Sequence, residues 1–354
     1  MGALRVVGRS LLPFLVGIPL LLGLQAAFDH FDMVTTTLIL VNVGVNVVLA
    51  VSLNVVNGFT GQFSLGHAGF MAVGAYTSAK ITLALTAEPL LGLPPGISEQ
   101  LAFAIALGAA MLASGLAGFL VGMPSLRLRG DYLAIVTLGF GMIIVSIIEN
   151  IGALGKAIGL SGVPGLTTLT WTGMAVIATI SMARRLAVST QGRALFAIRE
   201  DEVAAEAMGV DTTGYKVRAF AISAAFAGLA GGLMVHLLQL ATPRSFTFIR
   251  SFEVVVMVVL GGLGSITGSV LAATLLTVLI EALREFDRYR MVVYAVMLIA
   301  LMLLRPQGLL GTRELWDLPL FRKLPWKKLG ASGAGGVEGA SPTEVRDDET
   351  GGVP

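Results

Sequence analysis

The sequence predicts an all-α fold: a polytopic integral membrane protein with about ten membrane elements, broken or re-entrant segments and a weak internal repeat. Of its 354 residues, 55% are hydrophobic and 13% are charged, whereas roughly 25% are charged in ordinary soluble domains. Two long segments, Met33–Ala79 and Val254–Ile280, contain no Asp, Glu, Lys or Arg. Each exceeds the length of about 20 residues that a helix needs to cross a bilayer, and each is interrupted by glycines.

Apolar windows follow one another along most of the chain and give the expected membrane elements. They fall near residues 11–28, 34–56, 68–87, 101–123, 131–148, 172–188, 217–238, 254–263, 267–283 and 290–304. The eighth is too short to cross alone, so we expect it to dip in from outside or to be extended by the preceding segment. Lys and Arg residues gather in alternate loops and near the C-terminus, which predicts that both termini are cytoplasmic. Residues 1–310 then form the transmembrane domain, and the small, polar residues of 311–354 form a largely disordered cytoplasmic tail.

The first uncharged segment must contain a turn. As one helix, Met33–Ala79 would be about 70 Å long at about 1.5 Å per residue, against a hydrocarbon core of about 30 Å. The glycine-rich stretch Asn57–Gly69 marks the turn. Irregular backbone is tolerated at membrane depth only where protein buries it or where it lines a cavity, because its amides need partners.

The second uncharged segment has a similar break at Gly261–Gly268. Aligning Gly61 with Gly262 places Ser64 on Ser265, which is a weak internal repeat that coincidence between two glycine-rich breaks could also produce. Paired broken segments in the two halves of a membrane protein indicate a transport path.

Polar residues and glycines of these segments are therefore candidates for a translocation path. They are Asn42, Asn46, Asn54, Gly61, Gln62, Ser64, His67, Gly262 and Ser265. The alternative for the asparagines is hydrogen bonding between helices, which is the commoner use of polar residues in lipid. The alternative for His67 is a hydrogen bond to a helix end.

The longest polar insertion between spans is the loop of residues 189–216. Within it, Asp201–Met208 predicts a short helix, because acidic residues in the first turn suit the helix dipole and Gly209 is a natural stop. Its alanines would let another protein approach closely. An ordinary amphipathic linker at the membrane surface is the alternative.

Other features exclude several functions. The chain has no cysteine and no G-x-x-x-x-G-K-[ST] motif, so we expect no thiol chemistry, no metal site and no ATP site of its own. Its net charge of +2 gives no case for nucleic-acid binding. A cytoplasmic flank of Arg127, Arg129 and Asp131 is expected to provide snorkelling anchors and an N-cap, with docking contacts as a secondary possibility.

Several passages resemble the permease subunits of branched-chain amino acid importers of the ATP-binding-cassette class. They are Leu53–Ala79, Leu126–Gly141, Gly192–Asp211 and Val259–Gly268, followed by Arg305–Gly311. The resemblance spans about residues 34–311 in the right order. Two departures concern substrate identity: Met142 replaces an acidic residue that the family often has, and an external glycine-rich stretch reads Gly159–Leu166 here.

The resemblance implies a multi-pass permease of the bacterial cytoplasmic (inner) membrane with several partners. These are a paralogous permease subunit in a heterodimer, two ATP-binding subunits that bind ATP and Mg, an external or periplasmic substrate-binding protein, and membrane lipid. The chain itself would bind no cofactor. It also implies that one helix over Arg199–Gly209 sits in the groove of an ATPase subunit. The residues of this expected coupling helix are Arg199, Glu200, Asp201, Glu202, Ala204, Ala205 and Gly209.

The expected function is translocation of leucine, isoleucine and valine by ATP-driven alternating access. The main alternative is a permease for urea or short amides. An ion-coupled carrier is more remote, because Glu149, Glu253 and Glu281 all lie near predicted span ends rather than at the midplane. An intramembrane hydrolase using Ser64 and His67 lacks an acidic orienting partner in the sequence nearby.

Overall fold

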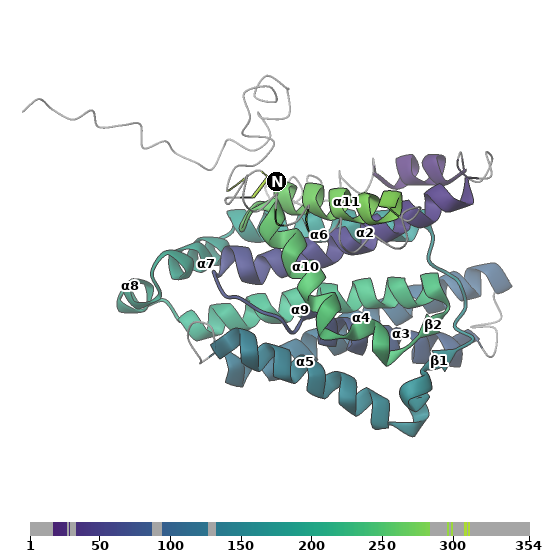
Figure 1. The fold of residues 1–354 in the computed structure, drawn as a ribbon, viewed down its shortest axis with the longest axis horizontal. Coiled ribbons are helices and arrows are strands. Elements are labelled where there is room, and N and C mark those ends of the chain that lie inside the picture. The colour runs from purple at the N-terminus through teal and green to yellow at the C-terminus, as the bar shows by residue number, and fades with distance from the viewer. Residues whose placement is uncertain are drawn as a thin grey trace, which may run out of the picture. The chain divides into compact units, whose positions relative to one another are not determined.

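A computed structural model describes residues 17–26, 28, 33–86, 94–126, 132–283, 296, 299, 308, 309 and 311. All of them belong to one compact unit, Met1–Glu314. The described residues are mainly helical (Figure 1), which confirms an all-α membrane protein. Five helices of the described residues are long and apolar enough to cross a membrane, so the count of about ten membrane elements remains a prediction. The tail and most of the window at residues 290–304 lie outside the described residues.

The helices follow the predicted windows closely. Their bounds are α2 Val34–Asn54, η1 Val55–Phe59, α3 His67–Thr86, α4 Pro95–Ser125, α5 Tyr132–Asn150, α6 Leu169–Val188, α7 Thr190–Glu200, α8 Glu202–Ala207, α9 Thr212–Leu238, α10 Phe248–Gly261 and α11 Ile266–Ala282. Short 3₁₀ turns are η3 Gly152–Leu154, η4 Lys156–Ile158 and η5 Pro243–Phe246. The strands β1 Leu160–Ser161 and β2 Leu240–Ala241 pair antiparallel, with Leu160 opposite Ala241.

Helices α3, α4 and α9 pack through small residues. A methyl group added at Gly74 of α3 would lie 2.2 Å from Gly228 Cα of α9, and one added at Gly118 of α4 would lie 2.3 Å from the Cβ of Ala224. Small residues let helix backbones approach closely in membranes, where packing rather than the hydrophobic effect drives helix association.

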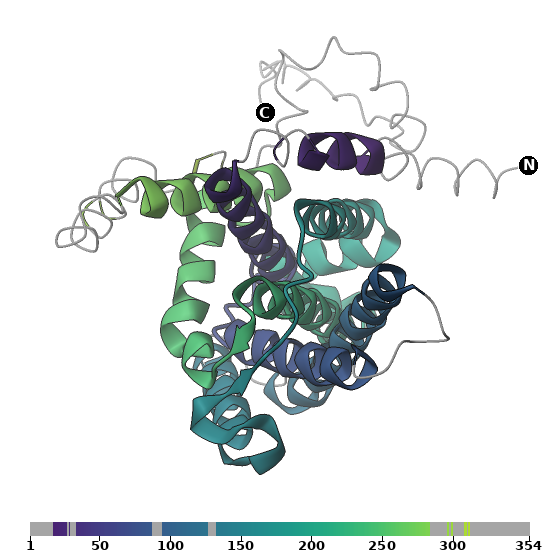
Figure 2. The same cartoon turned by 90° about the vertical axis from the view of Figure 1, so that its right-hand side faces the viewer.

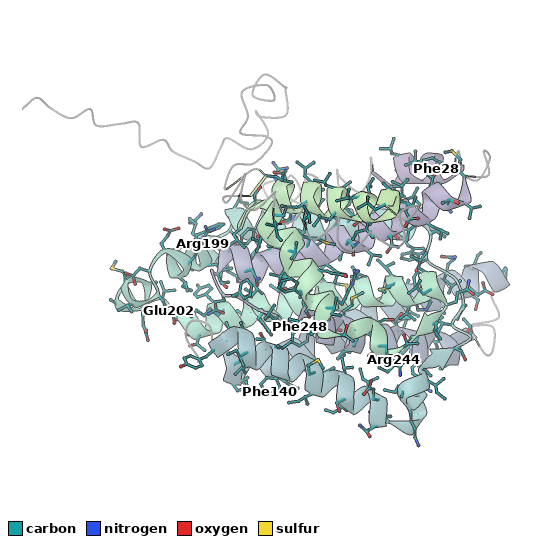
Figure 3. The ribbon with its side chains drawn as sticks, viewed as in Figure 1. Phe28, Phe140, Arg199, Glu202, Arg244 and Phe248 are labelled. Carbon is teal, nitrogen blue, oxygen red and sulfur yellow. The ribbon has the colours of Figure 1, made fainter. Side chains whose placement is uncertain are left out.

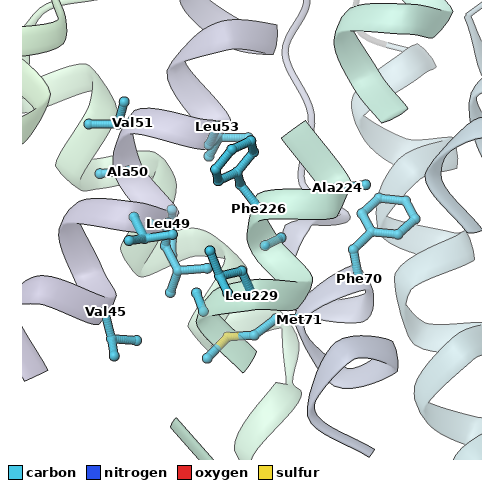
Figure 4. Packing of buried hydrophobic residues seen from close by; sticks show 14 of the residues in the cluster. Val45, Leu49, Ala50, Val51, Leu53, Phe70, Met71, Ala224, Phe226 and Leu229 are labelled. Atoms are coloured by element: carbon cyan, nitrogen blue, oxygen red, sulfur yellow. The ribbon is translucent and has the colours of Figure 1, made fainter. Parts of the chain in front are cut away.

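A continuous apolar core joins this group to α2. Leu49 and Leu53 of α2 face Phe226 and Leu229 of α9, with Met71 of α3 beside them (Figure 4). The apolar residues of α2 occupy all sides of the helix, as expected for a helix buried within a membrane protein.

The first break lies where the sequence predicts it but is shorter. Helix α2 continues through the π-helical turn η1, and α3 begins at His67, so only residues 60–66 are non-helical. The prediction of irregular backbone from Asn57 to Gly69 is therefore wrong at both ends. A π turn inserts one extra residue into a helix and often marks a functional position.

The eighth window is extended by the segment before it, as one of the two expectations had it. Helix α10 begins at Phe248 and contains 14 residues, which is about 21 Å of helix and less than a full crossing. It runs obliquely to α2 and α9 in Figure 1, and it lies across the view in Figure 2, where most other helices are seen end-on. The chain thus reaches the second break through a half-length helix.

Candidate functional site: the junction of two breaks

The π turn η1, just before the first break, contacts the second break directly. A Cβ added at Gly58 would lie 2.4 Å from the backbone nitrogen of Gly264. Asn54 joins the breaks with both ends of its amide: Nδ2 donates to the carbonyl of Ser265 over 3.0 Å, and Oδ1 accepts the Gly264 N–H over 2.9 Å. The Gly264 N–H, which lies in the second break, is thereby satisfied by a side chain of α2, as a membrane interior requires.

Glycine is required in this junction by backbone geometry. Gly61 has φ +69° and Gly262 has φ +107°, both in the region that side chains disfavour. Ser265 then starts α11 as its N-cap, accepting the Gly268 N–H. Leu309, which belongs to the family-like passage Arg305–Gly311, also contacts this junction. Its N–H donates to the carbonyl of Leu260 over 2.7 Å.

Arg199 brings the cytoplasmic loop into contact with the junction. Its Nη1 donates to the carbonyl of Gly58 over 2.8 Å. One turn earlier on α7, the ring of Phe196 lies 5.1 Å from that of Phe59 in η1. Arg199 and Glu202 both lie at the end of the molecule where α7 and α8 are found (Figure 3).

The structure divides the expected coupling helix in two. Asp201 has extended backbone and separates α7, which ends at Glu200, from the short helix α8. The single helix expected over Arg199–Gly209 is therefore wrong, whereas the short helix predicted at Asp201–Met208 is confirmed within one residue at each end. Asp201 Oδ1 accepts the N–H groups of Val203 and Ala204 over 2.9 and 3.0 Å, which fixes the start of α8.

The surface of α8 differs from the predicted one. Val203 is 63% exposed and Met208, just after α8, is 84% exposed, although both are apolar. Ala204 is exposed too, but Ala205 is only 6% exposed and packs inside the chain. The exposed apolar residues, which the alanine pattern did not reveal, fit the close approach of another protein.

A buried ion pair ties α8 to α9. Glu202 Oε2 lies 2.6 Å from Nζ of Lys216, whose side chain is 2% exposed. The short helix is thus attached to the membrane bundle as well as to α7. The other residues predicted for coupling, Glu200 and Gly209, are exposed.

Most of the predicted path residues are partners of other helices. Asn54 and Ser265 share the junction described above, Ser64 N–H donates to Asn57 Oδ1 over 3.2 Å, and Nε2 of His67 lies 3.0 Å from Ser52 Oγ. Both Ser64 and His67 are buried. Of the remainder, Asn42 and Gly61 are exposed, Gln62 is half-buried and Gly262 is buried. The flank residues Arg127, Arg129 and Asp131 lie outside the described residues.

The structure also reveals a charged group that the sequence windows missed. Arg250 Nη2 donates to Asn46 Oδ1 over 2.6 Å and Nη1 to Glu253 Oε2 over 3.0 Å, while Asn46 Nδ2 donates to Thr277 Oγ1 over 2.8 Å. Asn46 lies halfway along the 26-residue helix Val34–Phe59. Glu253 lies in the first half of α10, which begins at Phe248, six residues before the predicted window.

A signal for this group was available in the sequence. Arg250 and Glu253 are three residues apart, the spacing of neighbours on one helix face, and they directly precede the second uncharged segment. Arg250 Nε is buried without a hydrogen-bond partner among the described residues. No group of three or more His, Asp or Glu residues in the described part of the chain is placed to hold a metal ion.

Comparisons with known proteins agree with this architecture. Residues 35–302 match the family model described as branched-chain amino acid transport system / permease component. The chain is 38% identical over 314 residues to the high-affinity branched-chain amino acid transport system permease protein LivM of Salmonella typhimurium, covering 79% of this chain and 69% of that protein. It is 37% identical to LivM of Escherichia coli over the same shares.

A second group of relatives is more distant. The permease protein LivH of Salmonella typhimurium is 26% identical over 291 residues, which cover 75% of this chain and 91% of that protein. No solved structure matches. The family match covers well over half of the chain and the LivM proteins exceed 30% identity, so the chain belongs to the permease-component family of branched-chain amino acid transport systems.

Proposed function

We propose that this chain is the membrane-spanning permease subunit of an ATP-binding-cassette importer that translocates branched-chain amino acids. The protein is a multi-pass membrane permease of a transport family, and the proposal adds the mechanism: ATP-driven alternating access. The observation that carries the mechanism is the continuous connection from α8, through α7 and Arg199, to the junction of the two breaks. Such a connection lets a movement outside the membrane change a path within it.

The proposed partners follow from what this chain offers. A second, paralogous permease completes the path as a heterodimer, an idea supported by similarity to proteins named LivM and LivH alike. Two ATPase subunits bind ATP and Mg; one docks on the exposed apolar residues Val203 and Met208 of this chain, and the other docks on the paralogous permease. A periplasmic binding protein delivers the amino acid. The proposed location is the bacterial inner membrane, with both termini on the cytoplasmic side. Residues 1–310 form the permease domain and residues 311–354 form the tail.

The proposal is tested by uptake of labelled leucine. Cells carrying the complete transporter, with and without this chain, are compared in the presence of excess unlabelled urea. Uptake that requires this chain and ignores urea is the expected result. Uptake of labelled urea without leucine uptake would leave the role as importer permease in place and refute the assignment of branched-chain amino acids as substrate.

Docking is tested separately by a matched pair of substitutions on α8. Ala204→Arg places a bulky charge on the exposed face and should abolish uptake while membrane insertion stays normal. Ala205→Arg, whose position is buried within this chain, should instead lower the amount of folded protein. Normal uptake by well-expressed Ala204→Arg protein would refute docking through this face.

A further inference from the structure

Arg199 occupies a slot that only glycines leave open. A Cβ added at Gly61 would lie 3.0 Å from Arg199 Cγ, and a Cβ added at Gly264 would lie 2.6 Å from its Nη1. Gly58, the third glycine of the slot, supplies the carbonyl that this guanidinium binds. One side chain of α7 therefore contacts the π turn at Gly58, the first break at Gly61 and the second break at Gly264.

The orientation of Arg199 separates it from the docking surface. Its neighbours Glu200 and Asp201 are exposed, as is Arg193 on the same helix, whereas Arg199 is half-buried and directed at the membrane bundle. Phe196, one turn away, also points toward η1 through its contact with Phe59. The inner face of α7 is thus a contact with the breaks, and α8 carries the outward face.

We propose that Arg199 is a positioning residue that transmits movement of α7 and α8 to both breaks at once. The proposal rests on the proposed function, since it assigns a route to the coupling that an ATP-driven permease requires. The guanidinium is planar and holds its donors in a fixed fork; one of these donors, Nη1, binds the Gly58 carbonyl and lies beside Gly264. A shift of α7 therefore moves Gly58 with it or breaks this hydrogen bond.

Arg199 contacts the first segment at an irregular turn. The accepted carbonyl belongs to the π turn η1, a rare helical form that is often found at functional sites. The second break follows because Asn54 joins Gly264 and Ser265 to α2. A single displacement of Arg199 therefore changes both segments together.

The test uses the complete transporter in vesicles, with ATP hydrolysis and leucine uptake measured on the same preparation. For R199A we expect ATP hydrolysis within about twofold of wild type and at least a tenfold loss of leucine taken up per ATP. R199K keeps a donor for the Gly58 carbonyl but lacks the fork, so its ratio should be intermediate. R193A removes a similar charge from the exposed face of α7 and should leave the ratio unchanged.

A second readout does not depend on the substrate. The chain has no cysteine, so L263C, at an exposed position between Gly262 and Gly264, reports on the second break alone. Its rate of labelling by a maleimide, followed by the mass of this chain, should change on addition of ATP in the wild-type background and not in R199A.

The outcomes separate the two proposals. An unchanged uptake ratio and an unchanged ATP response of L263C in R199A would overturn the role of Arg199. Equal loss of hydrolysis and uptake, with loss of assembled complex, would show that Arg199 only stabilises the structure, and would likewise refute its role in transmitting movement. A wild-type complex that takes up no leucine, yet shows the ATP response and loses it in R199A, would overturn only the substrate.

Discussion

Asn54 offers the sharpest test of the junction, because its side chain hydrogen-bonds to the backbone of two adjacent residues, Gly264 and Ser265. Asn54→Ala removes the acceptor of the Gly264 N–H and the donor to the Ser265 carbonyl. A hydrogen bond contributes about 0.5–1.5 kcal/mol net. The Ser265 carbonyl keeps the N–H and the Oγ of Ser269 as donors, and the half-buried Gly264 N–H can reach water. We therefore expect only the loss of the two hydrogen bonds, about 1–3 kcal/mol in the free energy of unfolding.

The assay is equilibrium unfolding of the purified chain in mixed detergent micelles. The matched control is Asn42→Ala, twelve residues earlier on the same helix, where the side chain is exposed; its effect should stay within about 0.5 kcal/mol, as for most surface substitutions. Equal unfolding free energies for the two variants would show that the amide of Asn54 does not hold the breaks together.

Three further predictions concern other contacts. Gly74→Ala should cost about 3 kcal/mol in the same unfolding assay, because the new methyl group meets backbone atoms of α9, whereas Gly139→Ala, with nothing within 4 Å, should be neutral or stabilise by up to about 1 kcal/mol. Asp201→Ala should speed hydrogen exchange of the first α8 amides about fivefold, because it removes about 1 kcal/mol of capping. Asp201→Asn keeps a capping oxygen and should not change the rate. Unchanged exchange in the alanine variant would contradict the cap. Arg250→Met and Glu253→Gln should each destabilise by about 1–3 kcal/mol, because each leaves a partly buried partner unpaired. The double variant should cost less than the sum of the two; strict additivity would show that the pair does not interact.

The sequence located both breaks because their physics is local. A long uncharged run cannot remain one helix in a bilayer, and glycine is the residue that permits the required turn, so Gly61 and Gly262 could be found without a structure. The short helix after Asp201 was predictable for a similar reason, since a capping carboxylate and a stop glycine act within a few residues. The shorter extent of the first break was not, because the π turn depends on contact with Gly264 and Arg199.

The sequence could not show which distant parts of the chain a given side chain contacts. Arg199 was assigned to the docking helix by its neighbours, yet its side chain points to a carbonyl 141 positions away. Ala205 was expected on a smooth docking face, but it is buried against the rest of the chain. The contact of Arg250 with Asn46 was missed because the two residues are 204 positions apart, and a hydropathy window carries no information on such a contact.

The glycine contacts among α3, α4 and α9 also determine which parts of the chain are free to move. Where Gly74 meets Gly228 and Gly118 meets Ala224, the backbones interlock so closely that one helix cannot slide along another without a collision. Packed elements of this kind rotate or translate as a single body, and displacement is taken up at irregular segments between such bodies. In a transport cycle, these three helices would therefore stay fixed relative to one another, while α10, α11 and the π turn of α2 move against them.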